Sequence, residues 1–374
     1  MIFTKIISID TYIFGDLAKD YYCNDKRRKN QAVGFIDYFI QKGYIPFFSF
    51  HHLEEILQYE NDREIFNRWS LIKKFPMVAW FCGCNDKEIL GSIFDIQSTE
   101  VKYLASREIK GFKDVVSSVR DELIRYSSGE EFVSQFEDVY FRLRDLGMVD
   151  TQRSKAIESI SHARDKKIDK IKLSTLNTSA LKSKSEVNDF LNIYVSSIEE
   201  SILKIGDKKL VEHRYVAERF VDEVRNRSDS FFSDDDSSLL EKFVKASGVR
   251  LDQINTKSTI GDLGYLGVYN SRIRLISESL KINVADIEAL SQEDVPSWVV
   301  WREIDKMMKN EPYAHGSNMI DKDMSVLALY VDVFIVDKRV NEYFRQLKTK
   351  ITALNQCLNK VLKLSHYSKL SRII

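Results

Sequence analysis

The chain has 374 residues, of which 44% are hydrophobic, enough for two domains or for one domain with a large insertion. Basic and acidic residues are equal at 56 each, so the net charge favours no class of partner, and any basic surface has to be local. Four cysteines are too few for a disulfide scaffold, and no signal peptide or run of about 18 apolar residues occurs, which predicts a cytoplasmic protein without membrane contact.

The first hundred residues alternate strand and helix patterns. Residues 6–9 are β-branched and apolar, which predicts a buried strand that ends at Asp10. The elements expected after it are a helix over 32–41, a strand over 44–50, helices over 51–59 and 62–74, and a strand over 77–81. This β-α-β-α-β order predicts a parallel sheet covered by helices.

The middle of the chain, residues 101–294, has a different character. It contains no proline, and its amphipathic stretches predict helices over 112–126, 131–146, 186–205 and 210–225. Residues 233–238 carry three adjacent aspartates, which we interpret as an exposed turn because the spacing of a calcium-binding loop is absent. We therefore expect residues 101–294 to form an all-α insertion domain.

The α/β pattern returns near the C-terminus. The expected elements are a helix over 296–309, a short helix over 323–329, a strand over 331–336, and helices over 340–347 and 354–370. The strand ends at Asp337. The predicted fold is therefore an α/β domain with a parallel sheet built from both chain ends, residues 1–100 and 295–374, around the helical insertion.

Two acids each end one of these apolar strands, Asp10 near the start of the chain and Asp337 near its end. Ligands of open α/β sheets bind beyond the carboxyl ends of the strands, so the two acids are expected to share one site. Carboxylates that lie together repel each other, and a bound divalent cation relieves that repulsion. The pair therefore predicts a metal-dependent site.

Other acids occupy positions from which they could join the pair. Glu54 and Glu55 lie on the helix that follows the second strand, where Leu53, Ile56 and Leu57 form the apolar face. Asp323 is expected in the first turn of the helix before the last strand, where the helix dipole favours an anion. One acid at a strand end is usually an exposed loop residue or a helix cap. Four acids at related positions of the predicted fold would rarely arise by chance.

In this order, the segments around Asp10-Thr11, around Glu54-Glu55 and from Asp323 to Lys338 resemble the PIN-like nuclease domains. The resemblance covers residues 1–100 and 295–350. It implies a three-layer α/β/α fold, and it implies a metal-dependent nuclease, most often a ribonuclease. The four acids of the PIN-like family correspond to Asp10, to Glu55 with Glu54 as the alternative, to Asp323 with Asp321 as the alternative, and to Asp337. The long helical insertion departs from the family pattern.

Such a carboxylate set suits one or two Mg²⁺ or Mn²⁺ ions, which prefer oxygen ligands. Asp10 and Asp337 are the expected direct ligands, and Glu55 and Asp323 are expected to act through water. The reaction would be phosphodiester hydrolysis, with RNA as the expected substrate and single-stranded DNA as the alternative. The expected substrate-binding cations are Lys338 and Arg339, which follow the last acid, and Arg27 and Arg28 in a basic run. Tyr12 and Phe14 could stack on a base, although burial is commoner for such residues.

Other enzyme classes fit the sequence less well. A dehalogenase-type phosphatase needs a second aspartate where this chain has Tyr12, and the loop after the first strand lacks the glycines of a dinucleotide site. The main alternative is a catalytically inactive PIN-fold scaffold that binds a protein or RNA partner, or a second copy of the chain, through the helical insertion. For an active enzyme, RNA processing and toxin or defence roles are both compatible with the sequence.

Overall fold

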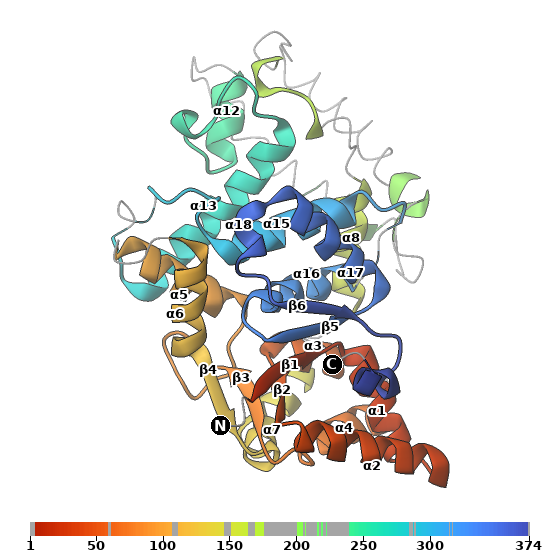
Figure 1. Cartoon of the computed structure of the whole chain (residues 1–374). Coiled ribbons are helices and arrows are strands. Elements are labelled where there is room, and N and C mark those ends of the chain that lie inside the picture. The colour runs from red at the N-terminus through yellow and green to blue at the C-terminus, as the bar shows by residue number, and fades with distance from the viewer. Residues whose placement is uncertain are drawn as a thin grey trace. The chain divides into compact units, whose positions relative to one another are not determined.

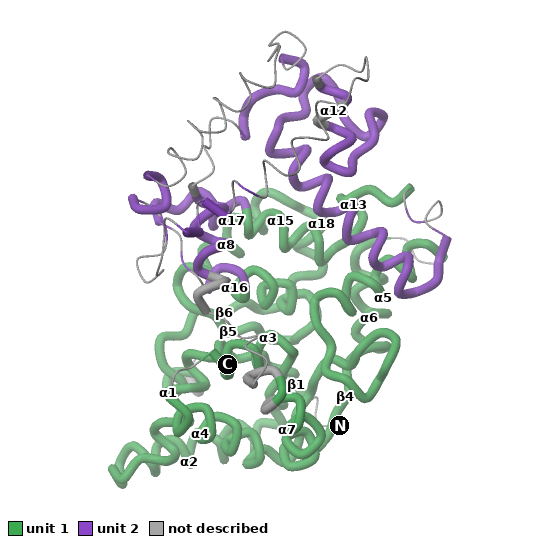
Figure 2. Tube along the Cα trace, turned by 180° about the vertical axis from the view of Figure 1, so that it is seen from behind, with its two compact units in different colours: residues 1–150, 289–305, 320–374 green, residues 151–288, 306–319 purple. Residues whose placement is uncertain are grey.

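The structure is a computed structural model that describes residues 4–58, 61–106, 111–145, 151–163, 169–175, 200–204, 206, 215–216, 218–219, 222, 239–283, 287, 289–313, 315 and 317–372. The chain divides into two compact units, coloured in Figure 2. The first consists of Met1–Asp150, Ala289–Asp305 and Ile320–Ile374, and the second of Thr151–Glu288 and Lys306–Met319. The unit that carries the sheet includes residues 101–150, which the prediction placed in the insertion, and excludes residues 306–319, which the prediction placed in the α/β domain.

The first unit contains a six-stranded sheet with the order β4-β3-β2-β1-β5-β6 (Figure 1). Four of the five neighbouring strand pairs are parallel, and only β3 and β4 are antiparallel. This confirms the predicted α/β class with a largely parallel sheet. The strands are β1 (Lys5–Ile9), β2 (Tyr44–Phe48), β3 (Val78–Phe81), β4 (Ile124–Ser127), β5 (Val333–Val336) and β6 (Lys360–Lys363).

The helices of the first unit connect these strands. α1 (Thr11–Tyr21) and α2 (Lys26–Gln41) lie between β1 and β2 in the chain, and α3 (Phe50–Leu57) and α4 (Asp62–Ile72) lie between β2 and β3. The remaining helical segments are α5 (Ile93–Ala105), α6 (Phe112–Leu123), α7 (Gly129–Asp145), α17 (Lys338–Lys350), α18 (Thr352–Asn355) and the 3₁₀ segments η4 (Val326–Leu329) and η5 (Tyr367–Arg372). α15 (Pro296–Lys309) and α16 (Asn318–Ser325) contribute residues to both units.

The second unit is helical where it is described. Its elements are α8 (Thr151–Ala163), α12 (Leu239–Ala246), α13 (Ile260–Leu280) and the 3₁₀ segments η1 (Leu173–Thr175) and η3 (Leu251–Gln253). Five buried residues form one small core: Leu173, Val244, Val249, Ile260 and Leu263. Most of the helices predicted over 186–205 and 210–225, and the whole acidic turn predicted over 233–238, lie outside the described residues. Across the described helices of the chain, none combines the length and the apolar character that a membrane span requires.

Several predicted elements differ from the observed ones. The helix predicted over 112–126 ends at Leu123, because the next four residues pair with the edge of β3 as strand β4. The helix predicted over 354–370 is replaced by α18, β6 and η5, since the backbone of Lys360–Lys363 pairs with β5. In both places a short segment gains its hydrogen bonds from a neighbouring strand, which overrides the local helical pattern. α1 was not predicted, because glycine and aromatic residues follow Asp10.

Asp332, which directly precedes β5, links this strand to β1. Its Oδ2 accepts a 2.7 Å hydrogen bond from the backbone N–H of Ile6, and both of its oxygens accept hydrogen bonds from Arg120 of α6 at 2.8 and 3.1 Å. Bidentate arginine–carboxylate contacts fix geometry as well as adding attraction. This contact therefore holds β1, β5 and α6 together at the amino ends of the two strands.

Candidate active site

Asp10 and Asp337 lie at the same edge of the sheet. β1 and β5 are parallel neighbours with Ile9 opposite Ile335, and the backbone N–H of Asp10 donates to Ile335 at 3.1 Å. Each acid directly follows its strand and caps the next helix. Asp10 accepts the N–H of Tyr12 at 2.9 Å, and Asp337 accepts the N–H of Val340 at 2.7 Å. The two strand-end acids predicted from the sequence are therefore brought together by the sheet.

The environment of Asp10 disfavours its ionised form. Burial and, to a smaller extent, the negative charge of Asp337 raise the pKa of the Asp10 carboxyl to about 6. The N–H of Tyr12 and the Arg339 guanidinium act in the opposite direction and lower the pKa. Asp10 is thus a carboxyl that shares its surroundings with another acid and is only partly compensated by donors and a cation.

Glu55 approaches the same place from α3. Burial raises the pKa of Glu55 most, and the negative charges of Asp321 and Asp10 also raise it, so that it reaches about 8. A hydrogen bond with the buried Thr11 side chain and the charge of Arg68 lower this pKa without offsetting the other effects. Near neutral pH, Glu55 is therefore mostly protonated in the absence of another cation.

The neighbouring Glu54 has a different partner. Its Oε2 lies 3.2 Å from Nδ1 of His51, whose Nε2 accepts the backbone N–H of Ile93 at 3.3 Å. Of the two alternatives left open by the sequence, Glu55 is thus the one whose charge is coupled to Asp10 and Asp321. Glu54 instead helps to hold His51 at the start of α3.

His52 fixes the start of α3 against β1. Its Nδ1 accepts the backbone N–H of Ser49 at 3.1 Å, and its Nε2 lies 3.1 Å from the hydroxyl of Ser8. Burial lowers the pKa of His52 to about 3, so the ring is neutral and its Nε2–H donates to Ser8. His52 therefore orients the helix that carries Glu55 and has a packing role.

Of the two alternatives for the third acid, Asp321 is the one whose charge is coupled to another of the predicted acids. α16 begins at Asn318, five residues earlier than predicted, so Asp321 and not Asp323 lies in its first turn. Asp321 accepts a 2.5 Å hydrogen bond from Arg339, and its charge acts on Glu55. Asp323 accepts a 2.7 Å hydrogen bond from the indole N–H of Trp301 on α15. The sequence alternative Asp321 thus takes the place expected for Asp323.

The four predicted substrate-binding cations have different surroundings. Arg339 lies among the acids, where it contacts Asp321 and its charge lowers the pKa of Asp10. Lys338 is exposed at the start of α17, directly after Asp337. Arg28 instead pairs with the buried Asp20 of α1, with Nε 2.8 Å from Oδ1, and so joins α2 to α1. Arg27 lies exposed in the same first turn of α2.

Arg68 of α4 is a site residue that the sequence interpretation missed. Its side chain is buried, its charge lowers the pKa of Glu55, and a Cβ at position 15 would overlap its guanidinium group. Gly15 thus allows the cation to approach α1 closely. A signal was present, because Arg68 lies on the same helical face as the buried Ile65 and Ile72, where a charged residue is unusual.

The carboxylates fit a hard divalent cation by their chemistry, since they offer only oxygen donors and two of them are destabilised as anions by burial. Their arrangement is looser than that of a formed site. Among the residues described, no group of three or more His, Cys, Asp or Glu side chains is placed to hold one metal ion. The Arg339 guanidinium supplies positive charge to Asp321 in this arrangement.

No family model matches the chain, and no match was found among the curated proteins or among the solved structures. What the site does has therefore to follow from its own residues.

Proposed function

We propose that the chain is a metal-dependent endonuclease that hydrolyses phosphodiester bonds, with RNA as its substrate. The observation that carries this proposal is the electrostatic coupling of Asp10 to Asp337 and of Glu55 to Asp321 and Asp10, at the carboxyl edge of a parallel sheet. The order of these acids along the chain is that of the PIN-like nucleases, and a PIN-like three-layer arrangement of the first unit is part of the proposal.

In this proposal Asp10 and Asp337 hold a Mg²⁺ or Mn²⁺ ion, and Asp321 and Glu55 complete the set. The bound cation would stabilise charge on a phosphoryl oxygen and acidify water. Glu55, whose pKa of about 8 is close to neutral pH, is suited to hold or move a proton at the attacking water. Arg339 and Lys338, adjacent to Asp337, would bind the phosphate that is cleaved.

The alternative function is a scaffold without catalysis. The observation that favours it is the pairing of Asp321 with Arg339, which satisfies an acid through an internal cation, together with the absence of a three-ligand group within the described parts of the chain. In that case the acids would stabilise the junction of β1, α3, α16 and α17. A protein or RNA partner would then bind through the second unit.

The direct test of the enzyme is cleavage by the purified full chain. Incubation with transfer RNA, messenger RNA and single-stranded DNA in Mn²⁺ is expected to give internal cleavage of RNA that EDTA abolishes. Internal products distinguish an endonuclease from an exonuclease. An absence of cleavage of all three substrates, in both Mn²⁺ and Mg²⁺, would contradict the proposed activity.

Metal binding can also be measured without a substrate. Mn²⁺ at about 100 times its dissociation constant should stabilise the folded state by about 2.7 kcal/mol, which corresponds to a rise of roughly 5 °C in the melting temperature of the first unit. The rise should be absent from Asp10→Asn and present in Asp25→Asn, because Asp25 is also a helix N-cap but lies at the start of α2. An unchanged melting temperature of the wild type would favour the scaffold.

A further inference from the structure

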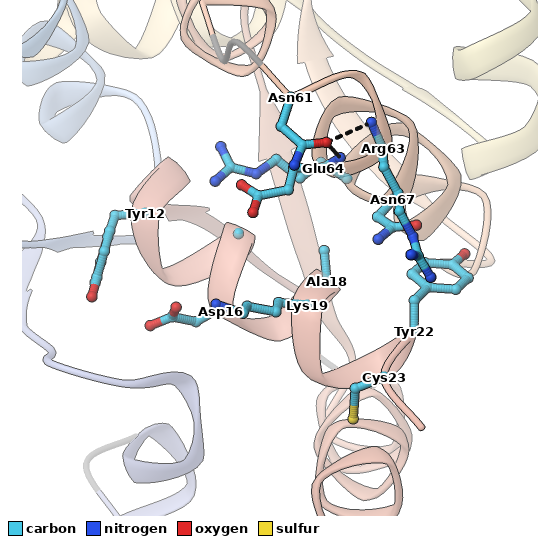
Figure 3. A pocket seen from close by; sticks show the side chains of 12 residues that line it. Tyr12, Asp16, Ala18, Lys19, Tyr22, Cys23, Asn61, Arg63, Glu64 and Asn67 are labelled. Atoms are coloured by element: carbon cyan, nitrogen blue, oxygen red, sulfur yellow. Dashed lines mark hydrogen bonds between the residues drawn. The ribbon is translucent and has the colours of Figure 1, made fainter. Parts of the chain in front are cut away.

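A cavity of about 430 Å³ lies between α1 and α4 (Figure 3), within the range of about 300–1,000 Å³ that is typical of ligand sites. It is lined along α1 by Tyr12, Gly15, Asp16, Ala18 and Lys19, at the end of α1 by Tyr22 and Cys23, and at α4 by Asn61, Arg63, Glu64, Asn67 and Arg68. We call this cavity the α1–α4 groove. Nothing in the proposed chemistry at the acids uses it.

Two residues that line the groove also interact with the acids. Tyr12 lines it, and the backbone N–H of the same residue donates to Asp10. Arg68 also lines it, and the charge of this residue acts on Glu55. From Tyr12 the groove follows α1 for its whole length, about 16 Å at the rise of an α-helix. A chain molecule that extends from the acids past Tyr12 would lie along α1.

The lining of the groove combines three kinds of group. Lys19 and Arg63 are exposed cations that can reach phosphates, and Tyr12 is an exposed aromatic residue, with 62% of its surface accessible. The other polar lining residues include the amides Asn61 and Asn67 and the acids Asp16 and Glu64. Amides and carboxylates are the groups that bind the edges of unpaired bases.

We propose that the α1–α4 groove binds the single-stranded RNA that flanks the scissile phosphate. This inference rests on the proposed function. Exposed cations and an exposed aromatic residue along one groove are the usual combination for single strands, because phosphates meet the cations while a base stacks on the ring. A duplex would hide the base edges that the amide and carboxylate groups can bind. A length of about 16 Å suits a few nucleotides.

The test measures RNA binding in the Asp10→Asn background, in which the bound strand should remain intact. Fluorescence anisotropy with a short unstructured RNA compares this protein with the same protein carrying Lys19→Gln and Arg63→Gln. The matched control carries Lys73→Gln and Lys74→Gln, which remove two exposed cations from the far end of α4. All four positions are exposed, so the variants should fold, and their melting temperatures verify this.

The groove variant is expected to bind the RNA about tenfold more weakly than its parent. Its slope of log affinity against log salt concentration should also be shallower by about 1.4, since each phosphate contact on a single strand contributes about 0.7. Tyr12→Leu should weaken binding about fivefold without changing this slope. The control variant should match the parent in both measurements.

The outcomes separate the groove from the function. If the wild type cleaves RNA but the groove variant binds with the affinity and salt slope of the control, the groove proposal is wrong and the nuclease stands. If the groove variant binds RNA more weakly and with a shallower salt slope, and the control variant does neither, the groove proposal is supported. If the wild type neither cleaves nor binds RNA, the proposed function fails, and the groove proposal fails with it.

Discussion

Asp10→Asn is expected to lower Mn²⁺-dependent RNA cleavage by at least about 10³-fold, because a bound cation contributes several kcal/mol to catalysis and each 1.4 kcal/mol corresponds to about tenfold in rate. The fold should be preserved. Asp10 caps α1 through its Oδ1, and asparagine caps a helix about as well as aspartate. The variant thus removes a negative charge while keeping the local structure, and initial cleavage rates measure the effect.

Three further variants make this result specific. Asp337→Asn keeps the cap of α17 and is expected to lose activity in the same way. Asp321→Asn should also lose activity, because the charge of Asp321 acts on Glu55. Asp323→Asn should retain most of the activity, since Asp323 bonds to Trp301. Asp25→Asn is the matched N-cap control and should be fully active. Wild-type rates from a folded Asp10→Asn protein would refute the assignment of the site.

Glu55→Gln is expected to combine lost cleavage with increased stability. In metal-free buffer at about pH 8.5, the free energy of unfolding should rise by about 2 kcal/mol. Each pKa unit corresponds to about 1.4 kcal/mol, so the displacement from 4.5 to about 8 sets an upper limit of about 5 kcal/mol. The expected gain is smaller because the folded state relaxes around the ionised carboxylate and admits water to it. Glutamine keeps the shape and cannot ionise.

The sign of this effect depends on pH. The folded-state pKa of Glu55 is raised, so between about pH 4.5 and pH 8 the folded state keeps a proton that the unfolded state has released. The stability of the wild type therefore falls as the pH rises through this window, and this loss is absent below it. The advantage of Glu55→Gln should consequently be large at pH 8.5 and nearly absent at pH 4.5.

Urea unfolding of the wild type and the variant across this pH range provides the measurement. Glu54→Gln is the matched control, because it changes the neighbouring residue of the same helix, whose partner is His51. That variant should show no comparable gain at high pH. A Glu55→Gln protein whose stability follows that of the wild type at every pH would show that Glu55 is an ordinary exposed carboxyl, and would remove it from the site.

The two acids that end strands could be predicted because their signals are local. A short β-branched run followed by an aspartate fixes where each strand ends, and the parallel pairing of β1 with β5 brings the two ends together. Glu55 could be narrowed to one of two neighbours by the apolar spacing of α3. These features depend on a few consecutive residues, which is where patterns are most informative.

The features that were missed depend on distant partners. Because α16 begins at Asn318, its first turn contains Asp321 and not the predicted Asp323. Helix starts are poorly defined in a sequence when no strong cap precedes them. Strands β4 and β6 exist because β3 and β5 offer edges to pair with, which no local pattern reveals. The role of Arg68 needed the proximity of Gly15 on another helix. The missed strands and the role of Arg68 depend on partners that lie far away in the sequence.

Strand β1 is synthesised long before β5, the strand with which it pairs. The backbone of Ile6 is bound by Asp332, which is 326 positions later in the chain. At about 5–20 residues per second, roughly 15–65 s separate the synthesis of these two residues. For most of that interval the nascent chain carries Asp10 and Glu55 but not Asp321, and throughout it the chain lacks Asp337. If the proposed nuclease is correct, the growing chain is harmless to the messenger RNA being translated until its last parallel strands emerge.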